Sequence, residues 1–305
     1  MKGKIIIDTD PGQDDAMAIM LAVKSENFKI LAFTTVCGNS TIENTTRNAR
    51  YLLSVLERED IPVYSGAQRP LKIDLIQAVV HGKSGLEGID PTNESKLTGN
   101  AVEKILTIVK ENPREITLVT LGPLTNIALA IQKDPKTMQK VKEIVTMGGA
   151  INVAGNKNRV AEFNIFVDPD AAKIVFDFPV KKSLVPLDAC NNVLLTMQDF
   201  EAVKDKKLRE VLIKMNRPYI RNLAKDAGVK GALMYDPLTV FYLLKKNTCK
   251  KYDDNIQVET KGDVTRGMTV IDRRKVTDLL KPNVTIVNYI SQAKFRKTFT
   301  DVLNR

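Results

Sequence analysis

Cysteine is scarce in this sequence. The chain of 305 residues contains three, Cys37, Cys190 and Cys249, and they lie far apart. A disulfide framework needs several cysteines at regular spacing and a zinc site needs clustered ones, so the sequence argues against both. We interpret the three residues as reduced cysteines that serve as small apolar side chains in the core.

Long apolar runs, linkers and repeats are also missing. No apolar run approaches the roughly 20 residues that a membrane-spanning helix needs, and residues 1–4 lead directly into a predicted strand instead of a signal peptide. No Pro/Gly/Ser-rich stretch or internal repeat divides the chain. We therefore expect a single domain over residues 1–305, a cytoplasmic location and no membrane partner.

Acidic residues are outnumbered, and the formal net charge is +10. The densest basic patch is formed by Lys245, Lys246, Lys250 and Lys251. No aromatic residues interleave these lysines in the sequence, although nucleic-acid binding surfaces use aromatic rings as stacking platforms. We expect a solvated, lysine-rich surface and no nucleic-acid partner.

The chain alternates predicted strands with predicted helices. Strand patterns lie near residues 5–7, 30–36, 116–121, 142–147 and 183–187. Helical patterns lie between them, for example at residues 41–56, 101–109 and 169–176. This order predicts an α/β fold with an open, mainly parallel, Rossmann-like sheet that helices cover on both faces.

Two further segments differ from this alternation. The strand patterns near residues 269–271 and 284–287 have no helix between them, so we expect them to form a small antiparallel C-terminal appendix. The loop around residues 81–85 is long, and long loops in compact domains are often lids or binding loops.

The chemistry starts where the first strand ends. Three isoleucines at residues 5–7 are followed by Asp8, Asp10, Asp14 and Asp15, with a Pro-Gly turn between the second and third acid. In open α/β sheets, ligands bind at the carboxyl ends of the strands. Clustered carboxylates repel one another, and a hard divalent cation relieves the repulsion. The oxygen-only donor set favours Ca²⁺ over zinc and leaves Mg²⁺ open.

Simpler interpretations exist for each acid. Asp14 and Asp15 begin a helix and can stabilise its first turn, although one acid is enough for that. Asp236 precedes a proline at the start of a later apolar helix and can cap it. Glu162 and Asn164 would project from one side of an extended segment, where they can hold neighbouring hydroxyls, but an exposed polar loop is the alternative.

The motifs together resemble those of the inosine–uridine nucleoside hydrolase family. The resemblance runs in the family's order from the first strand to about residue 244, and the last sixth of the chain carries no motif. Seven segments carry it: residues 8–16, 37–39, 81–86, 122–126, 147–149, 161–164 and 236–238.

The resemblance implies hydrolysis of the N-glycosidic bond of purine or pyrimidine ribonucleosides to ribose and free base, with a tightly held Ca²⁺. The implied metal ligands are Asp10, both oxygens of Asp15, the Leu121 carbonyl and Asp236. The implied contacts to the sugar or to the attacking water are Asp14, Asn39, the Met147 main chain, Asn156, Glu162 and Asn164. The stretch before Asn156 is one residue longer than the family's usual spacing, so Asn152 and Asn158 stay as alternatives. Family members are commonly homodimers or homotetramers.

The mechanism implied is a single displacement with inversion at C1′. Asp10 accepts the proton of the attacking water, and the carboxylates around the ribose stabilise an oxocarbenium-like transition state.

The side of the site that faces the leaving base departs from the family pattern. Members that prefer inosine and uridine usually have His directly before the Asp-Pro-Leu motif, and this chain has Tyr235. A phenol is a weaker acid than an imidazolium. Our hypothesis places Tyr235, His81 and Tyr219 around the base. Loop packing for His81 and core packing for Tyr219 are the alternatives.

The sequence contains no tryptophan. The purine-specific branch of the family relies on tryptophans that sandwich the base, so this absence argues against that branch's mechanism while leaving inosine, uridine and cytidine open as substrates. Two other functions stay as alternatives. One is a non-catalytic nucleoside- or ribose-binding protein that keeps the calcium site. The other is a magnesium phosphotransferase using Asp8 and Asp10, which the following Pro-Gly turn and second acidic pair do not fit.

Overall fold

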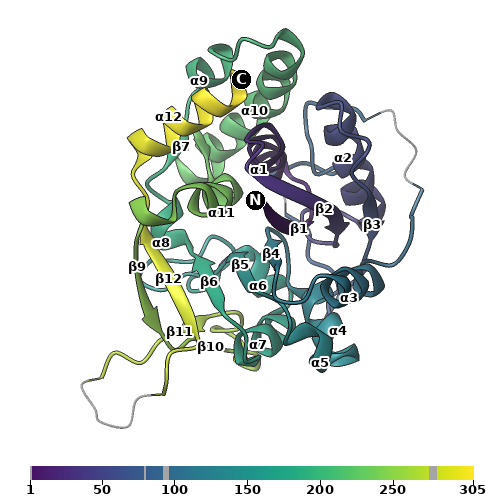
Figure 1. The fold of residues 1–305 in the computed structure, drawn as a ribbon. Helices are drawn as coiled ribbons and strands as arrows, with labels where there is room; N and C mark the ends of the chain where they lie inside the picture. The colour runs from purple at the N-terminus through teal and green to yellow at the C-terminus, as the bar shows by residue number, and fades with distance from the viewer. Residues whose placement is uncertain (1, 79, 92–95, 275–279) are drawn as a thin grey trace.

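A computed structural model describes residues 2–78, 80–91, 96–274 and 280–305. Its centre is an eight-stranded sheet (Figure 1). All neighbouring strands are parallel except the last pair. In spatial order the strands are β3 (Val63–Ser65), β2 (Phe28–Thr35), β1 (Gly3–Thr9), β4 (Ile116–Thr120), β5 (Glu143–Met147), β6 (Lys182–Val185), β12 (Val284–Tyr289) and β9 (Lys250–Asp254).

Helices cover both faces of the sheet, as predicted. Alternate residues of β1 separate the two cores, because Ile5 and Ile7 join one apolar cluster and Ile6 joins the other. The first cluster contains side chains of α1 (Gln13–Lys24), α2 (Ile42–Val55), α8 (Leu187–Cys190), α9 (Met197–Glu201), α10 (Lys206–Ala227), α11 (Tyr235–Lys245) and α12 (Gln292–Leu303). The second contains side chains of α3 (Ala101–Glu111), α4 (Thr125–Lys133), α5 (Pro135–Met138), α6 (Phe163–Val167) and α7 (Pro169–Asp177).

The strand order places a crevice beside β1. The chain runs outward through β2 and β3 on one side of β1 and then returns to β4 on the other. The carboxyl ends of β1 and β4 therefore form the point where the strand order reverses, which is where α/β sheets bind ligands. The Leu121 amide donates to the Asp8 carbonyl over 2.8 Å, so the segments that leave the two strands stay side by side.

The C-terminal region corrects one prediction. Thr269–Val270 forms β11, which pairs antiparallel with β10 (Gln257–Val258) outside the central sheet, as expected for the appendix. Residues 284–287 were assigned wrongly, because β12 lies in the central sheet, parallel to β6 and antiparallel to β9. Val284, Ile286 and Val287 are buried there, and β12 covers an edge of β6 that would otherwise be open.

Two small elements complete the fold. The ribbon of β7 (Leu194–Leu195) and β8 (Ala232–Leu233) joins the segment after α8 to the start of α11. A short 3₁₀ helix, η1 (Lys246–Thr248), follows α11. Within the described residues, no helix combines the length and apolarity that a bilayer crossing requires.

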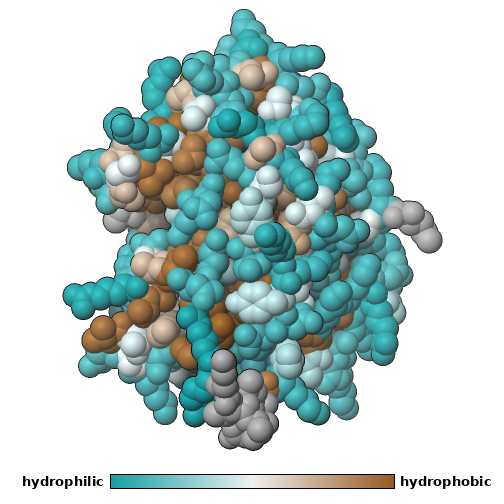
Figure 2. All heavy atoms as spheres, turned by 90° about the vertical axis from the view of Figure 1, so that its left-hand side faces the viewer, coloured by the Kyte–Doolittle hydropathy of each residue, from teal (hydrophilic) through white to brown (hydrophobic). Residues whose placement is uncertain are grey.

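The basic patch predicted between residues 245 and 251 lies against the protein's own aromatic rings. Lys246 pairs with the buried Glu143 over 2.6 Å and lies 5.2 Å from the ring centre of Tyr242. Lys250 lies 5.3 Å from the ring centre of Tyr289. Figure 2 shows this side of the molecule, where hydrophilic residues cover most of the surface and apolar side chains gather between them. Folding thus brings together lysines and rings that are separate in the sequence.

The C-terminal helix α12 is anchored by phenylalanines. Phe295 and Phe299 are fully buried, and their ring centres lie 5.8 Å apart. The Phe295 ring also meets Phe241 of α11 edge to face, with centres 5.7 Å apart. The last helix therefore belongs to the same core as α11, whose first turn carries Asp236.

We predict that Phe295→Ala lowers the free energy of unfolding by about 3–5 kcal/mol, because it removes a buried ring and leaves a cavity between α11 and α12. Denaturant unfolding measures the change. Lys294→Ala, at an exposed position of the same helix, is the control and should change the value by less than about 0.5 kcal/mol. Equal losses in both variants would show that the anchoring role is wrong.

Candidate functional site

Three aspartates from two helices meet at the crevice. Asp14 and Asp15 lie in the first turn of α1, and Asp236 lies in the first turn of α11, which packs against α1. One carboxylate oxygen from each lies within 4.8 Å of the others, and all three residues are buried. Folding therefore joins acids that are more than 200 residues apart in the sequence. The spacing is suitable for a metal ion.

Asp10 and Asn39 connect this group to the ends of β1 and β2. The Asn39 amide donates to Asp10 Oδ2 over 2.6 Å, and its side chain donates to Asp15 Oδ2 over 3.0 Å. Thr9 Oγ1 donates to the other Asp15 oxygen over 2.5 Å. The Gly12 amide also donates to Asp15 Oδ2, so Asp15 closes the first turn of α1 as well.

Two glycines leave room for the Asp10 carboxylate. A Cβ atom at Gly38 would lie 2.1 Å from Asp10 Oδ2, and one at Gly122 would lie 2.4 Å from Asp10 Oδ1. Any side chain at either position would displace the carboxylate. The absence of a side chain at both positions therefore lets the backbone approach Asp10 closely.

The carboxylates lack positive partners. Burial raises the pKa of Asp10, Asp14 and Asp236, and the negative charge of Asp15 raises all three further. Among the described residues no lysine or arginine pairs with them. One buried oxygen of each, Oδ1, also has no hydrogen-bond partner there. A cation bound to these oxygens would satisfy both the charge and the missing contacts.

The remaining predicted ligand and sugar contacts lie around the ends of β4 and β5. The Leu121 carbonyl accepts a hydrogen bond of 2.7 Å from the side chain of Asn164, which also lies 3.5 Å from the sulfur of Met147. These three residues are therefore neighbours in space, as their predicted roles require. Their individual roles stay predictions.

Glu162 holds backbone at the base of the site. Its carboxylate accepts from the amides of Asn164, Ile165 and Gly149 over 2.9–3.2 Å, and it thereby caps α6. Burial raises its pKa to about 7. The capping role explains why this acid is buried. Its predicted contact with a sugar hydroxyl stays a prediction.

His81 is fixed inside the protein. Its Nδ1 contacts the Gln13 side chain, and its Nε2 lies 3.7 Å from Asp14. The imidazole stacks on Tyr219, with ring centres 5.5 Å apart. Burial lowers the pKa of His81 to about 3, so the ring is neutral near pH 7.

The loop that carries His81 is fixed by hydrogen bonds on two sides. Ser40, just before α2, and Asn48, within α2, donate to the carbonyls of Lys83 and Ser84, each over 2.8 Å. On the other side, Asn222 of α10 donates to Glu87 over 2.9 Å and to the Val80 carbonyl over 3.1 Å. These contacts favour a binding loop over a freely moving lid.

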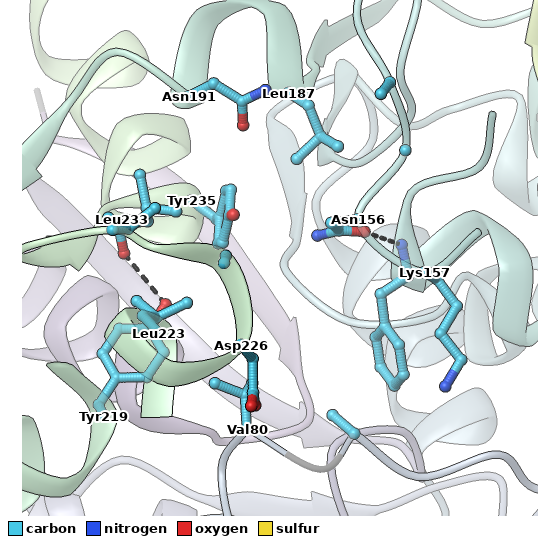
Figure 3. A pocket seen from close by; sticks show the side chains of 16 residues that line it. Val80, Asn156, Lys157, Leu187, Asn191, Tyr219, Leu223, Asp226, Leu233 and Tyr235 are labelled. Atoms are coloured by element: carbon cyan, nitrogen blue, oxygen red, sulfur yellow. Dashed lines mark hydrogen bonds between the residues drawn. The ribbon is translucent and has the colours of Figure 1, made fainter. Parts of the chain in front are cut away.

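A cavity of about 630 Å³ opens beside this loop (Figure 3). Tyr235 and Tyr219 line it, and the Tyr219 hydroxyl donates to the Leu233 carbonyl over 3.3 Å. Asn156 lines the opposite wall, where its side chain accepts from the Phe163 amide over 2.9 Å. The cavity adjoins the acids, because Tyr235 directly precedes Asp236 and Tyr219 stacks on His81.

The structure distinguishes between the three asparagines proposed for one sugar contact. Asn158 uses its side chain inside its own loop, where it accepts from the Val160 and Ala161 amides and donates to the Arg266 carbonyl. Asn152 is exposed, and only Asn156 of the three lines the cavity in the described part of the chain. This placement favours Asn156.

Tyr235 is a weak acid in this position. Burial raises its pKa above the usual phenol value, and the neighbouring Cys190 and Asp14 raise it further. Burial does the same at Tyr219. Both phenols are therefore protonated near pH 7. The Tyr235 hydroxyl can donate a hydrogen bond to a leaving group, whereas the Tyr219 hydroxyl already donates to the Leu233 carbonyl.

Sequence reasoning missed several residues that complete the site. Asp8 accepts from Thr34 over 2.5 Å and from Asn126 over 2.7 Å, so the acid left without a role supports the end of β1. Gln13 holds His81. Neither partnership has a sequence signal, because each depends on contacts between distant segments. Leu223, in contrast, follows Tyr219 by four residues on a helix, and that spacing indicates a shared face.

The comparisons with known proteins agree with this geometry. The family model "Inosine-uridine preferring nucleoside hydrolase" matches residues 5–297. The pyrimidine-specific ribonucleoside hydrolase RihA of Salmonella paratyphi C is 38% identical, with 98% of this chain and 96% of that protein covered.

Two solved structures are also similar. A plant nucleoside hydrolase, PpNRh1, superposes with a TM-score of 0.93 at 32% identity, with 100% of this chain and 99% of that one covered. The purine-preferring ribonucleoside hydrolase of Gardnerella vaginalis superposes with a TM-score of 0.90 at 29% identity, with 99% and 98% covered. Both matches span the sheet, the acidic cluster and the cavity described above. The chain therefore belongs to the inosine–uridine preferring nucleoside hydrolase family and is an N-glycosyl hydrolase.

Proposed function

We propose that this protein is a Ca²⁺-dependent hydrolase that splits ribonucleosides into ribose and free base. One observation carries the proposal: a buried group of carboxylates with no cationic partner among the described residues adjoins a cavity large enough for a nucleobase. The relatives support the reaction but not one base, since one is named pyrimidine-specific and another purine-preferring.

The donor set fits Ca²⁺. Asp15 and Asp236, which lie in the metal-suited group with Asp14, would hold the ion together with Asp10 and the Leu121 carbonyl, which the family resemblance adds. All of these donors are oxygens. The unpartnered Oδ1 atom of Asp236 is available for coordination. When bound, the ion lowers the pKa of a coordinated water and orients it.

The chain's own residues then provide a base and a grip on the sugar. Asp10 has one oxygen held by the Asn39 amide, which leaves the other oxygen to accept a proton from the attacking water. Asp14, Asn39, Asn164 and the end of β5 surround the place for the ribose hydroxyls. Carboxylates on this side stabilise the positive charge that develops on the sugar.

Hydrogen-bond donation assists the leaving base in this proposal. His81 is neutral and Tyr235 keeps its proton, so the described side chains around the cavity include no strong acid matched to pH 7. The Tyr235 hydroxyl would stabilise negative charge on the departing base without transferring its proton completely. This assistance is weaker than that of an imidazolium.

Domain number, assembly and cellular location are further proposals. We propose that the chain forms a single domain over residues 1–305, assembles as a homodimer or homotetramer and works in the cytoplasm. The single domain and the cytoplasmic location rest on composition, and the assembly rests on the family resemblance.

A panel of ribonucleosides and their 2′-deoxy analogues, assayed with and without a chelator, tests the main proposal. We expect ribose release from ribonucleosides, loss of activity on chelation, recovery with Ca²⁺ and at least about 100-fold slower deoxynucleoside turnover, because the 2′-hydroxyl is lost as a ligand. Mg²⁺ is the comparison ion. Absence of released sugar at any enzyme concentration would indicate a binding protein, and full deoxynucleoside activity would contradict the metal–ribose arrangement.

Tyr235→Phe tests the leaving-group side. Loss of the hydroxyl should slow natural nucleosides by about 100-fold, the lower end of the range for one hydrogen bond to a developing charge. A substrate with an activated leaving group, such as 4-nitrophenyl riboside, should lose much less. Tyr242→Phe is the matched control, because it removes a phenol outside the cavity. Equal loss on both substrate types would contradict the proposed role.

The raised carboxyl pKa values predict how pH affects the metal-free protein. Asp8 and Glu162 have folded-state pKa values of about 7, above their unfolded values. The folded state therefore binds more protons between about pH 4 and 7, and its stability falls as pH rises through that range. The lowered pKa of His81 has the opposite effect on stability, because below its usual pKa the unfolded state binds a proton that the folded state does not. This is one group against several carboxyls, so the effect of the carboxyls is larger.

We expect the melting temperature of chelated protein to be lower at about pH 8 than at about pH 5.5, and Ca²⁺ to raise it most at the higher pH. Thermal unfolding followed by circular dichroism measures both effects. A melting temperature that increases with pH in chelator would contradict this interpretation of the buried acids.

A further inference from the structure

One face of helix α10 forms a continuous wall of the cavity. Tyr219, Leu223, Asp226 and Ala227 all line it, and their spacing of four, three and one places them on the same side of a helix. Tyr219 marks the inner end of this wall, because it stacks on His81 beside Asp14. Asp226 is seven residues further along, which at 1.5 Å per residue is about 10 Å from Tyr219 along the helix axis.

The polar residues of the cavity differ in what they can recognise. Asn156 and Asn191 carry amides that offer both a donor and an acceptor, so neither distinguishes an amino group from a carbonyl. The Lys157 ammonium lies 5.8 Å from the ring centre of Phe163, on the wall opposite α10. Asp226 is the carboxylate among the described lining residues, and a carboxylate accepts hydrogen bonds only.

Helix stability does not explain this acid. Asp226 lies in the last turn of α10, which ends at Gly228 in the left-handed conformation. A negative charge at a helix C-terminus is unfavourable, because the backbone carbonyls already make that end negative. Within the described residues Asp226 also has no salt bridge or side-chain hydrogen bond. Figure 3 shows its side chain at the end of the cavity opposite Asn191.

The wall formed by α10 leads from Tyr219 to Asp226, so Asp226 would face one edge of a bound base. With the ribose at the acids, the base extends along the Tyr219–Leu223 surface toward Asp226. The edge furthest from the glycosidic bond carries the 4-substituent of a pyrimidine or the 6-substituent of a purine. An amino group there donates to a carboxylate, whereas a carbonyl oxygen is repelled by it.

We propose that Asp226 determines base specificity and favours bases with an amino group at that edge, so that cytidine is preferred to uridine and adenosine to inosine. This inference rests on the proposed ribonucleoside hydrolysis and extends it to the class of base. Asp226 acts on substrate selection and takes no part in bond cleavage.

The test compares kcat/KM for cytidine with that for uridine, and for adenosine with that for inosine, in the wild type and in Asp226→Asn. We expect the wild type to favour the amino base in each pair. Asp226→Asn should reduce both ratios by about five- to tenfold, the size of a charge-assisted hydrogen bond at a partly exposed site. Asp226→Ala should reduce them similarly.

Glu210→Gln is the matched control. It removes one negative charge from an exposed position on the same helix, outside the cavity, and should leave both ratios unchanged. Thermal unfolding with and without Ca²⁺ checks that every variant keeps its fold and metal response. Unchanged ratios in Asp226→Asn, together with normal folding, would overturn the inference while leaving nucleoside hydrolysis intact.

Failure of the proposed function gives a different result, because the wild type then releases no sugar from any of the four nucleosides. Equilibrium binding of cytidine and uridine by calorimetry still tests Asp226 in that case. Tighter binding of cytidine that is lost in Asp226→Asn would support the specificity role, and equal binding of both nucleosides would refute it.

Discussion

The repulsion among buried carboxylates is the constraint on which this structure depends. Asp10, Asp14, Asp15 and Asp236 lie together without a lysine or arginine partner in the described chain. Amides of Gly12 and Asn39, the Thr9 hydroxyl and the absence of Cβ atoms at Gly38 and Gly122 keep them in place. All these groups meet because β1 and β4 are adjacent at the point where the strand order reverses. The fold thus holds the acids together, and a cation bound among them would supply the missing positive charge.

Capping and chemistry are not alternatives in this site. Asp15 closes the first turn of α1 through Gly12 and also belongs to the metal-suited group. Glu162 caps α6 and fixes Gly149 at the end of β5, where the sugar contacts are proposed. The N-terminus of a helix carries partial positive charge and therefore favours a nearby carboxylate, as a bound cation does. The capping interpretation drawn from the sequence is therefore correct for Asp15, whereas the exposed polar loop offered as the alternative for Glu162 is wrong, because this acid is a buried cap. Neither cap decides the functional interpretation.

The features that depend on local sequence pattern were predicted correctly. Isoleucine runs, helical periodicity and the Pro-Gly turn predicted the layered parallel sheet and the position of the first acids, and the family motifs predicted that Asp236 joins them. The sequence pattern predicted the strand at residues 284–287 but not its place in the central sheet, because a short apolar strand contains no information about which neighbour it pairs with. The contact of His81 with Gln13 was hidden as well, since it joins two segments that approach only after folding. No sequence pattern marks Asp226, because its place at the cavity depends on how α10 packs.

Because Tyr235 is next to Asp236 in the sequence, the α11 side and the α10 side of the cavity differ in how freely their residues can be substituted. Both residues lie in the first turn of α11, so a substitution that moves Tyr235 also moves an acid of the metal-suited group. Helix α10 carries none of those acids, although it forms a whole wall. Evolution can therefore exchange side chains along α10 and adapt the protein to a new base at little risk to its chemistry.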